Sequence, residues 1–265
     1  MRIASTGHAL FAATLIILGI MGLISGDFGP IWDSVPKAWL ARAALAYLCD
    51  FICLACGIGL FLRSTAAIAA RVLLIYLLLW LLLIKGRYIV LAPLVEGFYQ
   101  SAGETAVFVA AAWVLYAWLA ADSGRKHAGF AVGERGLRIA RVLYGLALIA
   151  FGLSHYAYLE LTAPLVPDWL PGHVFWAYFT GATYLAAGAA MIIGVFARLA
   201  VVLSAWQIGL MTVLVWVPIL AAGHVSEQHW AETVVSCALT TGAWLVADGY
   251  RGLPWLAVNR WRDVT

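Results

Sequence analysis

Eight long runs of apolar residues constrain this chain more than any other feature of its sequence. A helix needs about 20 apolar residues to cross the hydrocarbon core of a bilayer, and each run approaches that length. A backbone exposed to lipid must satisfy its own hydrogen bonds, so we expect each run to form a transmembrane helix. The runs do not alternate as the strands of a membrane barrel would. The expected spans are residues 8–25, 40–62, 66–84, 103–121, 139–158, 174–196, 199–220 and 230–248.

The composition supports this interpretation. Of the 265 residues, 65% are apolar and 11% are charged, and the mean hydropathy is +0.95. Soluble domains are about 45–50% apolar and about 25% charged, so a soluble protein, a disordered chain and a nucleic-acid-binding protein are all excluded. The lipid bilayer is therefore the first expected partner. The net charge of +3 is small, and the positions of the charges are more informative than their sum.

Basic residues predict the orientation of the chain. With a cytoplasmic N-terminus, 12 of the 16 Lys and Arg residues fall on the inner side and 4 on the outer side. This bias favours cytoplasmic N and C termini. With its compact loops, the chain suits a bacterial inner (plasma) membrane as a multi-pass protein. Trp32 and Trp169 are expected in an outer aromatic belt, and Trp244 and Trp255 in an inner one.

The two halves of the chain resemble each other. At a shift of 135 residues, the second half repeats several residues of the first: Gly59, Phe61 and Arg63 correspond to Gly194, Phe196 and Arg198. Pro36 corresponds to Pro171 at the same shift. Glu104-Thr105 similarly resembles Glu232-Thr233. The predicted fold is all-α: a polytopic membrane protein whose eight transmembrane helices form two parallel-repeat four-helix bundles. The expected units are a first repeat (1–125), a basic cytoplasmic linker (126–137), a second repeat (138–250) and a cytoplasmic tail (251–265).

The second half also resembles a known family. The segments 151–158 (FGLSHYAY), 162–171 (TAPLVPDWLP), 178–188 (YFTGATYLAAG) and 197–200 (ARLA) are similar to the DoxX-like family of bacterial membrane proteins. Its members are typically single four-helix units, so this chain would be a tandem duplication. The family takes its name from a subunit of a quinone-linked redox complex. The resemblance thus implies an integral membrane subunit or anchor of a redox or quinone-linked assembly, with redox partner proteins and no catalysis by the chain alone.

Asp50 is the clearest intramembrane candidate. It lies near the middle of the second expected helix, whereas its counterpart in the second half is near Leu185. An ionisable residue within the bilayer is costly, so Asp50 is a candidate proton-carrying group. The alternative is a carboxylic acid hydrogen-bonded to a neighbouring helix for packing. Cys49, Cys53 and Cys56 share one helix face and are expected to be packing residues rather than a redox centre.

An outer cluster in the second half supplies the other candidates. Its members are His155, Glu160, His173, His224, His229 and Glu232. His229 and Glu232 are three residues apart on one helix face, which suits a polar ligand such as a quinone headgroup, or a metal if a second histidine approaches. The structural alternative places Glu104 and Glu232 in first helical turns, where the helix dipole favours acids. In that view Ser101 to Glu104 form a capping box.

Three functions remain open. The first is the redox or quinone-linked anchor. The second is a small-molecule or proton-coupled transporter built from duplicated bundles, although no pair of helices broken by Gly or Pro in matched positions supports it. The third is a metal-dependent membrane enzyme using the outer cluster. Quinone is preferred over metal or haem as the ligand, and a haem held by two histidines is disfavoured because His8 and His155 fall at opposite membrane depths. Assembly with copies of the chain or with other subunits is left open, and no sequence motif identifies an enzyme.

Overall fold

The computed structural model describes residues 4–32, 35–36, 39–121, 131–223 and 225–258. This part of the chain is helical and contains no strand, apart from an isolated bridge between Val195 and Val258. Seven of its helical segments are long and apolar enough to cross a membrane, which fits a multi-pass membrane protein. They are Thr6–Ser25, Arg42–Phe61, Ala66–Leu91, Glu96–Ala120, Gly133–Ala157, His173–Ile193 and Ala197–Ala221.

The eighth expected span forms the helix α11 (Glu227–Asp248). Its 22 residues are long enough to cross a membrane, but it contains more polar side chains than the seven helices above. Thr233 is buried and Ser236, Thr240 and Thr241 are half-buried, because α11 packs against α1, α5 and α9. The prediction of eight spans is therefore matched by eight long helical segments, of which seven have the apolar character that a lipid-facing helix needs.

The first half contains four long helical segments and a short loop helix. The third segment is continuous through a π-helical turn. Its elements are α1 (Thr6–Ser25), η1 (Pro30–Trp32), α2 (Arg42–Phe61), α3 (Ala66–Leu79), the π-helical turn η2 (Trp80–Lys85), α4 (Gly86–Leu91) and α5 (Glu96–Ala121).

The second half follows the same order. Its elements are α6 (Gly133–Ala157), the short α7 (Leu159–Thr162) and η3 (Ala163–Leu165), α8 (His173–Ile193), α9 (Ala197–Met211), the π-helical turn η4 (Thr212–Trp216), α10 (Val217–Ala221) and α11. Short turns at Arg63 and at Val195–Phe196 connect the second and third helices of each half, as the sequence predicts.

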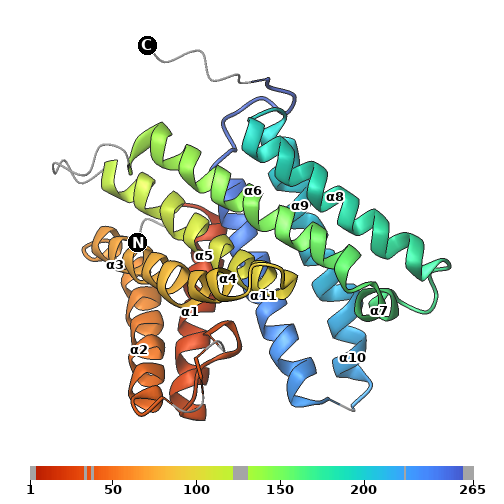
Figure 1. The fold of residues 1–265 in the computed structure, drawn as a ribbon. Coiled ribbons are helices and arrows are strands. Elements are labelled where there is room, and N and C mark those ends of the chain that lie inside the picture. Colours follow the sequence, from red (N-terminus) through yellow and green to blue (C-terminus); the bar gives the residue numbers. More distant parts are fainter. Residues whose placement is uncertain (1–3, 33–34, 37–38, 122–130, 224, 259–265) are drawn as a thin grey trace.

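The helices pack in the same sequence within each half (Figure 1). In the first half α1 packs on α2, α2 on α3 and α3 on α5; in the second, α6 packs on α8, α8 on α9 and α9 on α11. Between the halves, α5 packs on α6 and α11 packs on α1. The last helix of each half thus contacts the first helix of the other, and α5 and α11 also contact each other.

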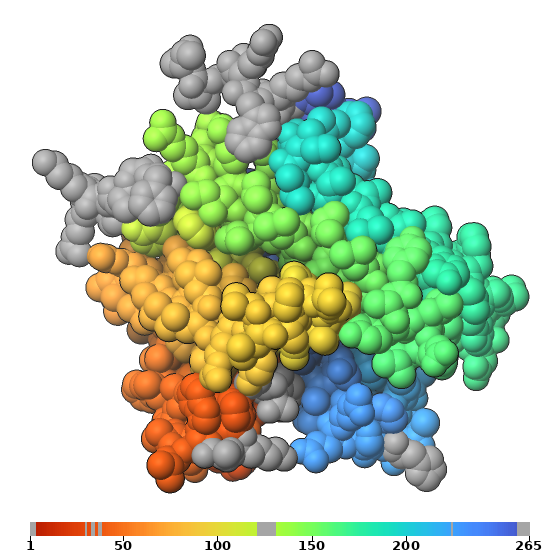
Figure 2. Space-filling model, viewed as in Figure 1, coloured from red at the N-terminus to blue at the C-terminus, as the bar shows by residue number. Residues whose placement is uncertain are grey.

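The described chain begins and ends at the same end of the bundle. The backbone N–H of Gly7, in the first turn of α1, donates to Asp248 Oδ2 at the end of α11 over 2.8 Å. The Tyr250 hydroxyl donates to the carbonyl of Leu137, near the start of α6. We call this the terminal end, and the opposite end the loop end. At the loop end a hollow separates a lobe of α1 and α2 from a lobe of α10 and α11 (Figure 2).

Glycines allow the first two helices of each half to touch. A Cβ atom on Gly57 of α2 would lie 2.9 Å from the carbonyl oxygen of Ala12 in α1. In the second half, a Cβ on Gly145 would lie 2.9 Å from the Gly188 carbonyl oxygen, and one on Gly188 would lie 2.7 Å from the Gly145 carbonyl oxygen. Small residues at such contacts let two backbones approach closely, which is a common way to pair helices within a membrane.

Two expected helix boundaries are wrong. The helix expected from residue 103 begins at Glu96, so Glu104 lies in the third turn of α5 and not in the first. Ser101 is inside the helix, so the proposed capping box does not exist. The polar residues between positions 96 and 102 made this stretch look like a loop in the sequence. In the structure they are part of the helix and most of them are at least half-buried against other parts of the protein. Similarly, α6 begins at Gly133, inside the expected linker 126–137, whose residues 126–130 lie outside the described part of the chain.

Both third helices are interrupted in matching places. The π-helical turn η2 follows 14 residues of α3, and η4 follows 15 residues of α9. Gly86 follows the first interruption directly, and Pro218 lies at the start of α10 after the second. These are π turns within continuous helices and not the breaks at Gly or Pro that the sequence was expected to lack. A π turn inserts one residue into a helix, which the sequence pattern does not reveal, and such turns are frequent at functional sites.

Gly188→Ala tests the contact between α6 and α8. The added methyl group would meet the Gly145 backbone, which cannot move aside, so we expect a loss of about 1–3 kcal/mol in unfolding free energy. Thermal unfolding in detergent measures the change. Gly252→Ala is the control, since no atom lies within 4 Å of a Cβ at that position. Equal stability of the two variants would contradict the proposed close contact.

Candidate functional site

Asp50 lies at the contact between α1 and α2, where Gly22 makes room for it. The side chain is 1% exposed. A Cβ atom on Gly22 would lie only 2.1 Å from the Asp50 carboxyl carbon, so the carboxyl group occupies the space that a side chain on α1 would fill. Gly19, one helical turn earlier, contacts the Asp50 backbone in the same way. The glycines of α1 thus seat a carboxyl group inside the bundle.

The Asp50 carboxyl group has no hydrogen-bond partner among the described residues. Both of its oxygens are fully buried. Among these residues, no hydrogen bond of the kind that the packing alternative requires is present. Burying an ionised carboxylate without a partner is so costly that the group takes up a proton instead. The location in mid-helix was predicted correctly, whereas the missing partner is a finding of the structure.

Two further buried polar groups without a strong hydrogen-bond partner lie in the adjacent third helix. The Trp80 indole Nε1 makes no hydrogen bond within the part of the chain that the structure describes, and the Tyr76 hydroxyl has the Cys49 thiol, a weak hydrogen-bonding group, as its neighbour. Tyr76 lies beside Cys49 and within electrostatic range of Asp50. Tyr76 and Trp80 are four residues apart, so they share one helix face. We call Asp50, Tyr76 and Trp80 the unpaired cluster.

Trp32 closes the unpaired cluster towards the loop end. It belongs to η1, in the loop between α1 and α2, and is 1% exposed. Its ring centroid lies 5.5 Å from those of both Tyr76 and Trp80, and 6.5 Å from that of Phe108 in α5. The expected place of Trp32 in an outer aromatic belt is therefore wrong, because this indole packs inside the protein.

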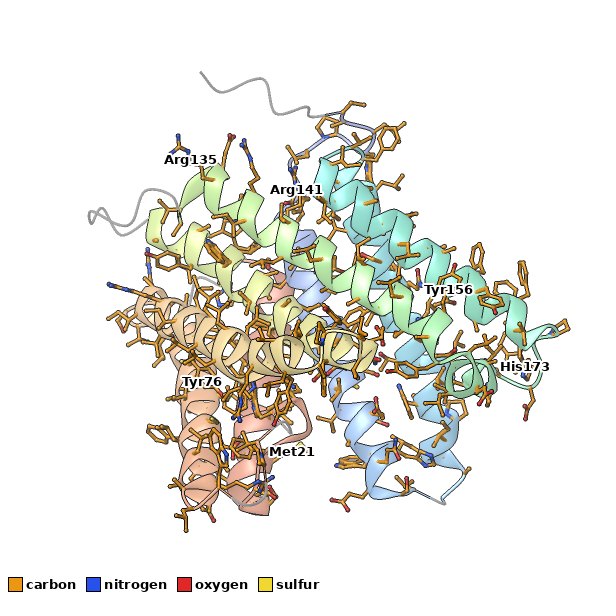
Figure 3. All side chains as sticks on the ribbon, viewed as in Figure 1. Met21, Tyr76, Arg135, Arg141, Tyr156 and His173 are labelled. Carbon is orange, nitrogen blue, oxygen red and sulfur yellow. The ribbon has the colours of Figure 1, made fainter. Side chains whose placement is uncertain are left out.

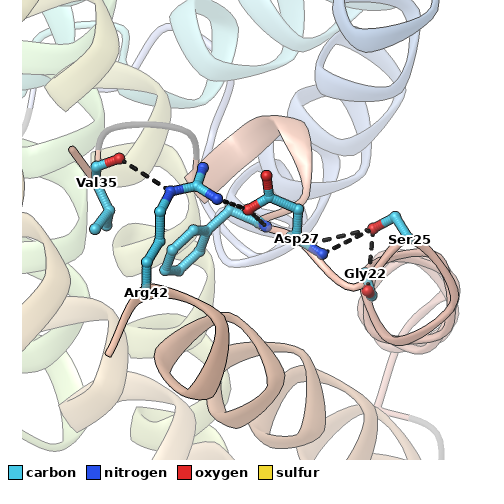
Figure 4. A network of polar contacts seen from close by, with 6 residues as sticks. Gly22, Ser25, Asp27, Val35 and Arg42 are labelled. Atoms are coloured by element: carbon cyan, nitrogen blue, oxygen red, sulfur yellow. Dashed lines mark hydrogen bonds and ion pairs between the residues drawn. The ribbon is translucent and has the colours of Figure 1, made fainter. Parts of the chain in front are cut away.

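An ion pair holds the loop that carries Trp32 (Figure 4). The Arg42 guanidinium pairs with Asp27, donates to the Val35 carbonyl at 3.4 Å, and lies 5.2 Å from the Phe28 ring centroid. The same Asp27 oxygen accepts a bond from the Phe28 backbone N–H. These contacts join both ends of the loop and keep Trp32 over the cluster.

The three cysteines of α2 fit the packing interpretation. Cys49, Cys53 and Cys56 are all buried and unbonded to one another. Cys237, the remaining cysteine, is exposed on α11. Cys49 and Cys53 lie next to Tyr76, so they form the wall of the unpaired cluster on the α2 side.

The second half satisfies its corresponding polar groups. The hydroxyl groups of Tyr144 and Ser204 are 3.0 Å apart, and those of Thr212 and Thr240 are 3.1 Å apart. The Thr183 hydroxyl donates to Gln207 Oε1 at 2.9 Å. At the position of Asp50 the second half has Leu185, which packs over Gly152 of α6. At this position, a buried unpaired carboxyl group therefore distinguishes the first half from the second.

A second polar group lies where the two halves meet. Lys85, at the end of η2, is 4% exposed and donates to Ser101 Oγ at 2.7 Å. Glu104 of α5 is within electrostatic range of both Lys85 and Glu232 of α11. The two glutamates occupy matching places in two helices that pack together. A buried ammonium group beside them reduces the repulsion between the two carboxylates.

The outer histidines predicted to form one site divide between two places. His155 and His173 belong to α6 and α8, which pack together, while His229 belongs to α11, which packs on α1, α5 and α9. Figure 3 shows His173 at the far edge of the second half, away from Tyr76. Among the described residues, no group of three or more His, Cys, Asp and Glu could hold a metal. His224 lies outside these residues.

The individual members of that predicted cluster have local roles. His155 donates from Nδ1 to the Phe151 carbonyl at 2.7 Å, and its ring packs on Tyr184. Glu160 and Glu232 are exposed, and His173 is the first residue of α8. The backbone N–H of His229 donates to the Ser226 side chain, which caps α11, while its buried Nδ1 has no partner in the described chain.

His8 also has a structural role. Its Nδ1 accepts a bond from the Ala4 N–H at 3.2 Å, which makes Nε2 the donor to the Leu60 carbonyl at 3.1 Å. Both ring nitrogens thus tie α1 to the end of α2. Both ring nitrogens are thus engaged in hydrogen bonds within the protein.

No family model, curated protein or solved structure matches this chain. The function must therefore be argued from the geometry of the site.

Gly22→Ala and Asp50→Ala form a double-mutant test of the carboxyl position. In the native background, the methyl group of Gly22→Ala collides with the carboxyl group, so we expect a loss of about 1–3 kcal/mol in unfolding free energy. With Asp50→Ala present, the same substitution should cost less than about 0.5 kcal/mol, because the colliding group is gone. Thermal or denaturant unfolding in detergent measures the coupling. Additive effects would show that Asp50 does not occupy this space.

Proposed function

We propose that this protein is a multi-pass membrane transporter that couples the movement of a small solute to a proton carried by Asp50. The observation that supports this proposal is the fully buried carboxyl group with two unpaired oxygens. A carboxyl group that no cation or donor fixes can gain and lose a proton as its access to water changes. Ionisable groups within membrane helices mark proton relays and substrate pathways in many transporters.

The interrupted third helices add a second argument. Trp80 of the unpaired cluster is the first residue of η2, and Lys85 is its last. A π turn weakens the regular hydrogen bonding of a helix, so the segment can change its twist at low cost. The two polar groups of the first half would then move together. Both halves carry such a turn in the third helix, and many transporters are built from structural repeats.

Trp32 acts as the closing element in this proposal. It separates the unpaired cluster from the loop end, where the hollow of Figure 2 opens. Opening of the Asp27–Arg42 pair would release the loop and admit water or solute to Asp50. The structure then corresponds to a state closed towards the loop end.

The arrangement in the membrane is also a proposal. We place all eight long helical segments across the bilayer, α11 included, with both termini in the cytoplasm of a bacterial cell. The one-sided distribution of basic residues supports this orientation. The matching packing of the two halves supports a tandem duplication of a DoxX-like four-helix unit.

Asp50→Asn is expected to abolish proton movement. In proteoliposomes containing a pH-sensitive dye, we expect one of three solute classes (amino acids, small carboxylates or amines) to drive proton uptake by the wild-type protein. The amide has the shape of the acid but cannot carry the proton, so proton uptake should fall to the level of empty liposomes. Glu160→Gln, which neutralises an exposed acid, is the control and should behave as wild type.

An infrared spectrum separates failure of this prediction from an untested solute. The wild-type protein should show the C=O band of a protonated carboxylic acid that Asp50→Asn removes and Glu160→Gln retains. Absence of that band at neutral pH would overturn the proposal that Asp50 holds a proton. If the wild-type protein shows this C=O band but none of the three solute classes drives proton uptake, Asp50 is protonated and coupled transport of these solutes is rejected.

A quinone-linked anchor is the second candidate, and two donors of the unpaired cluster favour it. The Tyr76 O–H and Trp80 N–H groups could each donate to a quinone carbonyl oxygen. If so, protein purified in mild detergent should contain quinone detectable by absorption and mass spectrometry. Trp80→Phe should lower that content at least fivefold, whereas Trp169→Phe, an exposed indole, should not. Quinone-free wild-type protein would reject this candidate and leave the transporter proposal untouched.

A further inference from the structure

A shallow pocket at the terminal end lies between the start of α9 and the end of α11. Two arginines, one carboxylate and two indoles line it together with apolar side chains: Arg198, Arg251, Asp248, Trp206, Trp244 and Val202. None of these residues belongs to the unpaired cluster or to the Lys85 group. The pocket contains two cationic side chains and one acid, so it has one positive charge in excess.

The C-terminal segment fixes Arg198 in position. Its Nη1 donates to the Leu253 carbonyl at 2.6 Å, and its guanidinium lies 4.1 Å from the Trp255 ring centroid. The same segment is joined to the turn before α9, where the Phe196 N–H donates to the Ala257 carbonyl at 2.9 Å. One nitrogen of Arg198 is thus engaged and its plane is stacked, so the guanidinium is oriented before any ligand arrives.

Asp248 fixes the second arginine. Its Oδ2 accepts the Gly7 N–H at 2.8 Å, and its Oδ1 lies 3.0 Å from Arg251 Nε. Both carboxylate oxygens are therefore in use, and the contact to Arg251 is made through its Nε. The Arg251 side chain is 54% exposed, so an incoming anion can reach it.

The position of Arg198 in α9 adds an electrostatic reason for an anion. It is the second residue of the helix, where the helix dipole presents partial positive charge. A cation at this end is unfavourable by itself. An anion bound between the two arginines would offset both the helix dipole and the repulsion between the guanidinium groups.

The apolar part of the pocket faces the membrane. Trp206 is 54% exposed and its ring centroid lies 5.9 Å from that of Trp244. Exposed indoles are typical of the depth where lipid headgroups meet acyl chains. Val202 lies between Arg198 and Trp206 on α9, one turn from each, so the apolar surface extends from the arginine towards the middle of the helix.

We propose that this pocket binds an anionic phospholipid, with its phosphate on Arg198 and Arg251 and an acyl chain along Val202 and Trp206. Basic pockets between membrane helices recognise such headgroups. The first half provides a comparison, because Arg63 takes the matching place after α2 but is simply exposed. Arg63 is thus a cation at the same end of the bundle without a built pocket.

Native mass spectrometry of the detergent-solubilised full chain tests the site. Phosphatidylglycerol should bind at least tenfold more tightly than phosphatidylcholine with the same acyl chains. Arg198→Gln and Arg251→Gln should each weaken phosphatidylglycerol binding about fivefold, the ratio that about 1 kcal/mol per basic residue represents. Arg63→Gln should change it less than twofold. Protection from thermal unfolding by phosphatidylglycerol should follow the same order.

Three outcomes would overturn the proposal. The first is equal binding of the two lipids by the wild-type protein. The second is an unchanged preference for phosphatidylglycerol in the variant that combines Arg198→Gln and Arg251→Gln. The third is a loss of phosphatidylglycerol affinity in Arg63→Gln as large as in Arg198→Gln or Arg251→Gln, which would indicate diffuse attraction to basic surface. Inorganic phosphate distinguishes a free-anion site, because protection by phosphate alone would reject the lipid. Since Arg198→Gln also removes the bond to Leu253, Arg251→Gln serves as the variant that leaves the folded C-terminal segment intact.

Discussion

The exclusion of water from a helical bundle requires each polar group inside it to find a partner within the protein. At several places in the second half, pairs of side chains meet that requirement, such as Tyr144 with Ser204 and Thr212 with Thr240. In the first half, the described residues do not meet it at the Asp50 carboxyl group and the Trp80 indole. An unmade hydrogen bond in the interior costs free energy, so a buried carboxyl group left unpaired between two closely packed helices is the strongest candidate for a functional group.

Close contact between α1 and α2 creates that place. A larger residue at position 22 would exclude the carboxyl group, and a larger residue at position 57 would separate the helices. The corresponding contact in the second half uses Gly145, Gly152 and Gly188, with Leu185 filling the space. The same geometry therefore accommodates either an acid or an aliphatic side chain, and the choice between them changes chemistry without changing the fold.

The sequence predicted the helices well because length and hydropathy are local properties. All eight runs correspond to helical segments, and Asp50 falls inside the second, as expected. Its partners could not be predicted in the same way. Tyr76 and Trp80 interrupt a run of Leu and Ile four residues apart, which is a visible signal, but the inward position of Trp32 depends on a loop that the Asp27–Arg42 pair fixes.

The errors share one physical cause. Glu104 was interpreted as a residue of a helix end because a charged residue within an apolar run suggests a boundary. In the structure it lies inside α5, where the positive charge of Lys85 from another helix partly offsets the cost of burying its carboxylate. The outer histidines were grouped because they fall on one predicted side of the membrane, yet α8 and α11 carry them to different places. Side of the membrane follows from local sequence, whereas lateral position depends on packing between distant helices.

The two halves of the proposed duplication also differ from each other at specific positions, which suggests different roles for them. At the middle of the bundle the first half carries the buried carboxyl group of Asp50, where the second half has Leu185. At the terminal end the relation is reversed, since Arg198 is held by the C-terminal segment while Arg63 is exposed. Two identical units would interact with the membrane in the same way. If the second half anchors the bundle through a lipid, as proposed, the first half would be the one that moves. Such movement would change the packing of α5 and α11, which contact each other between the halves.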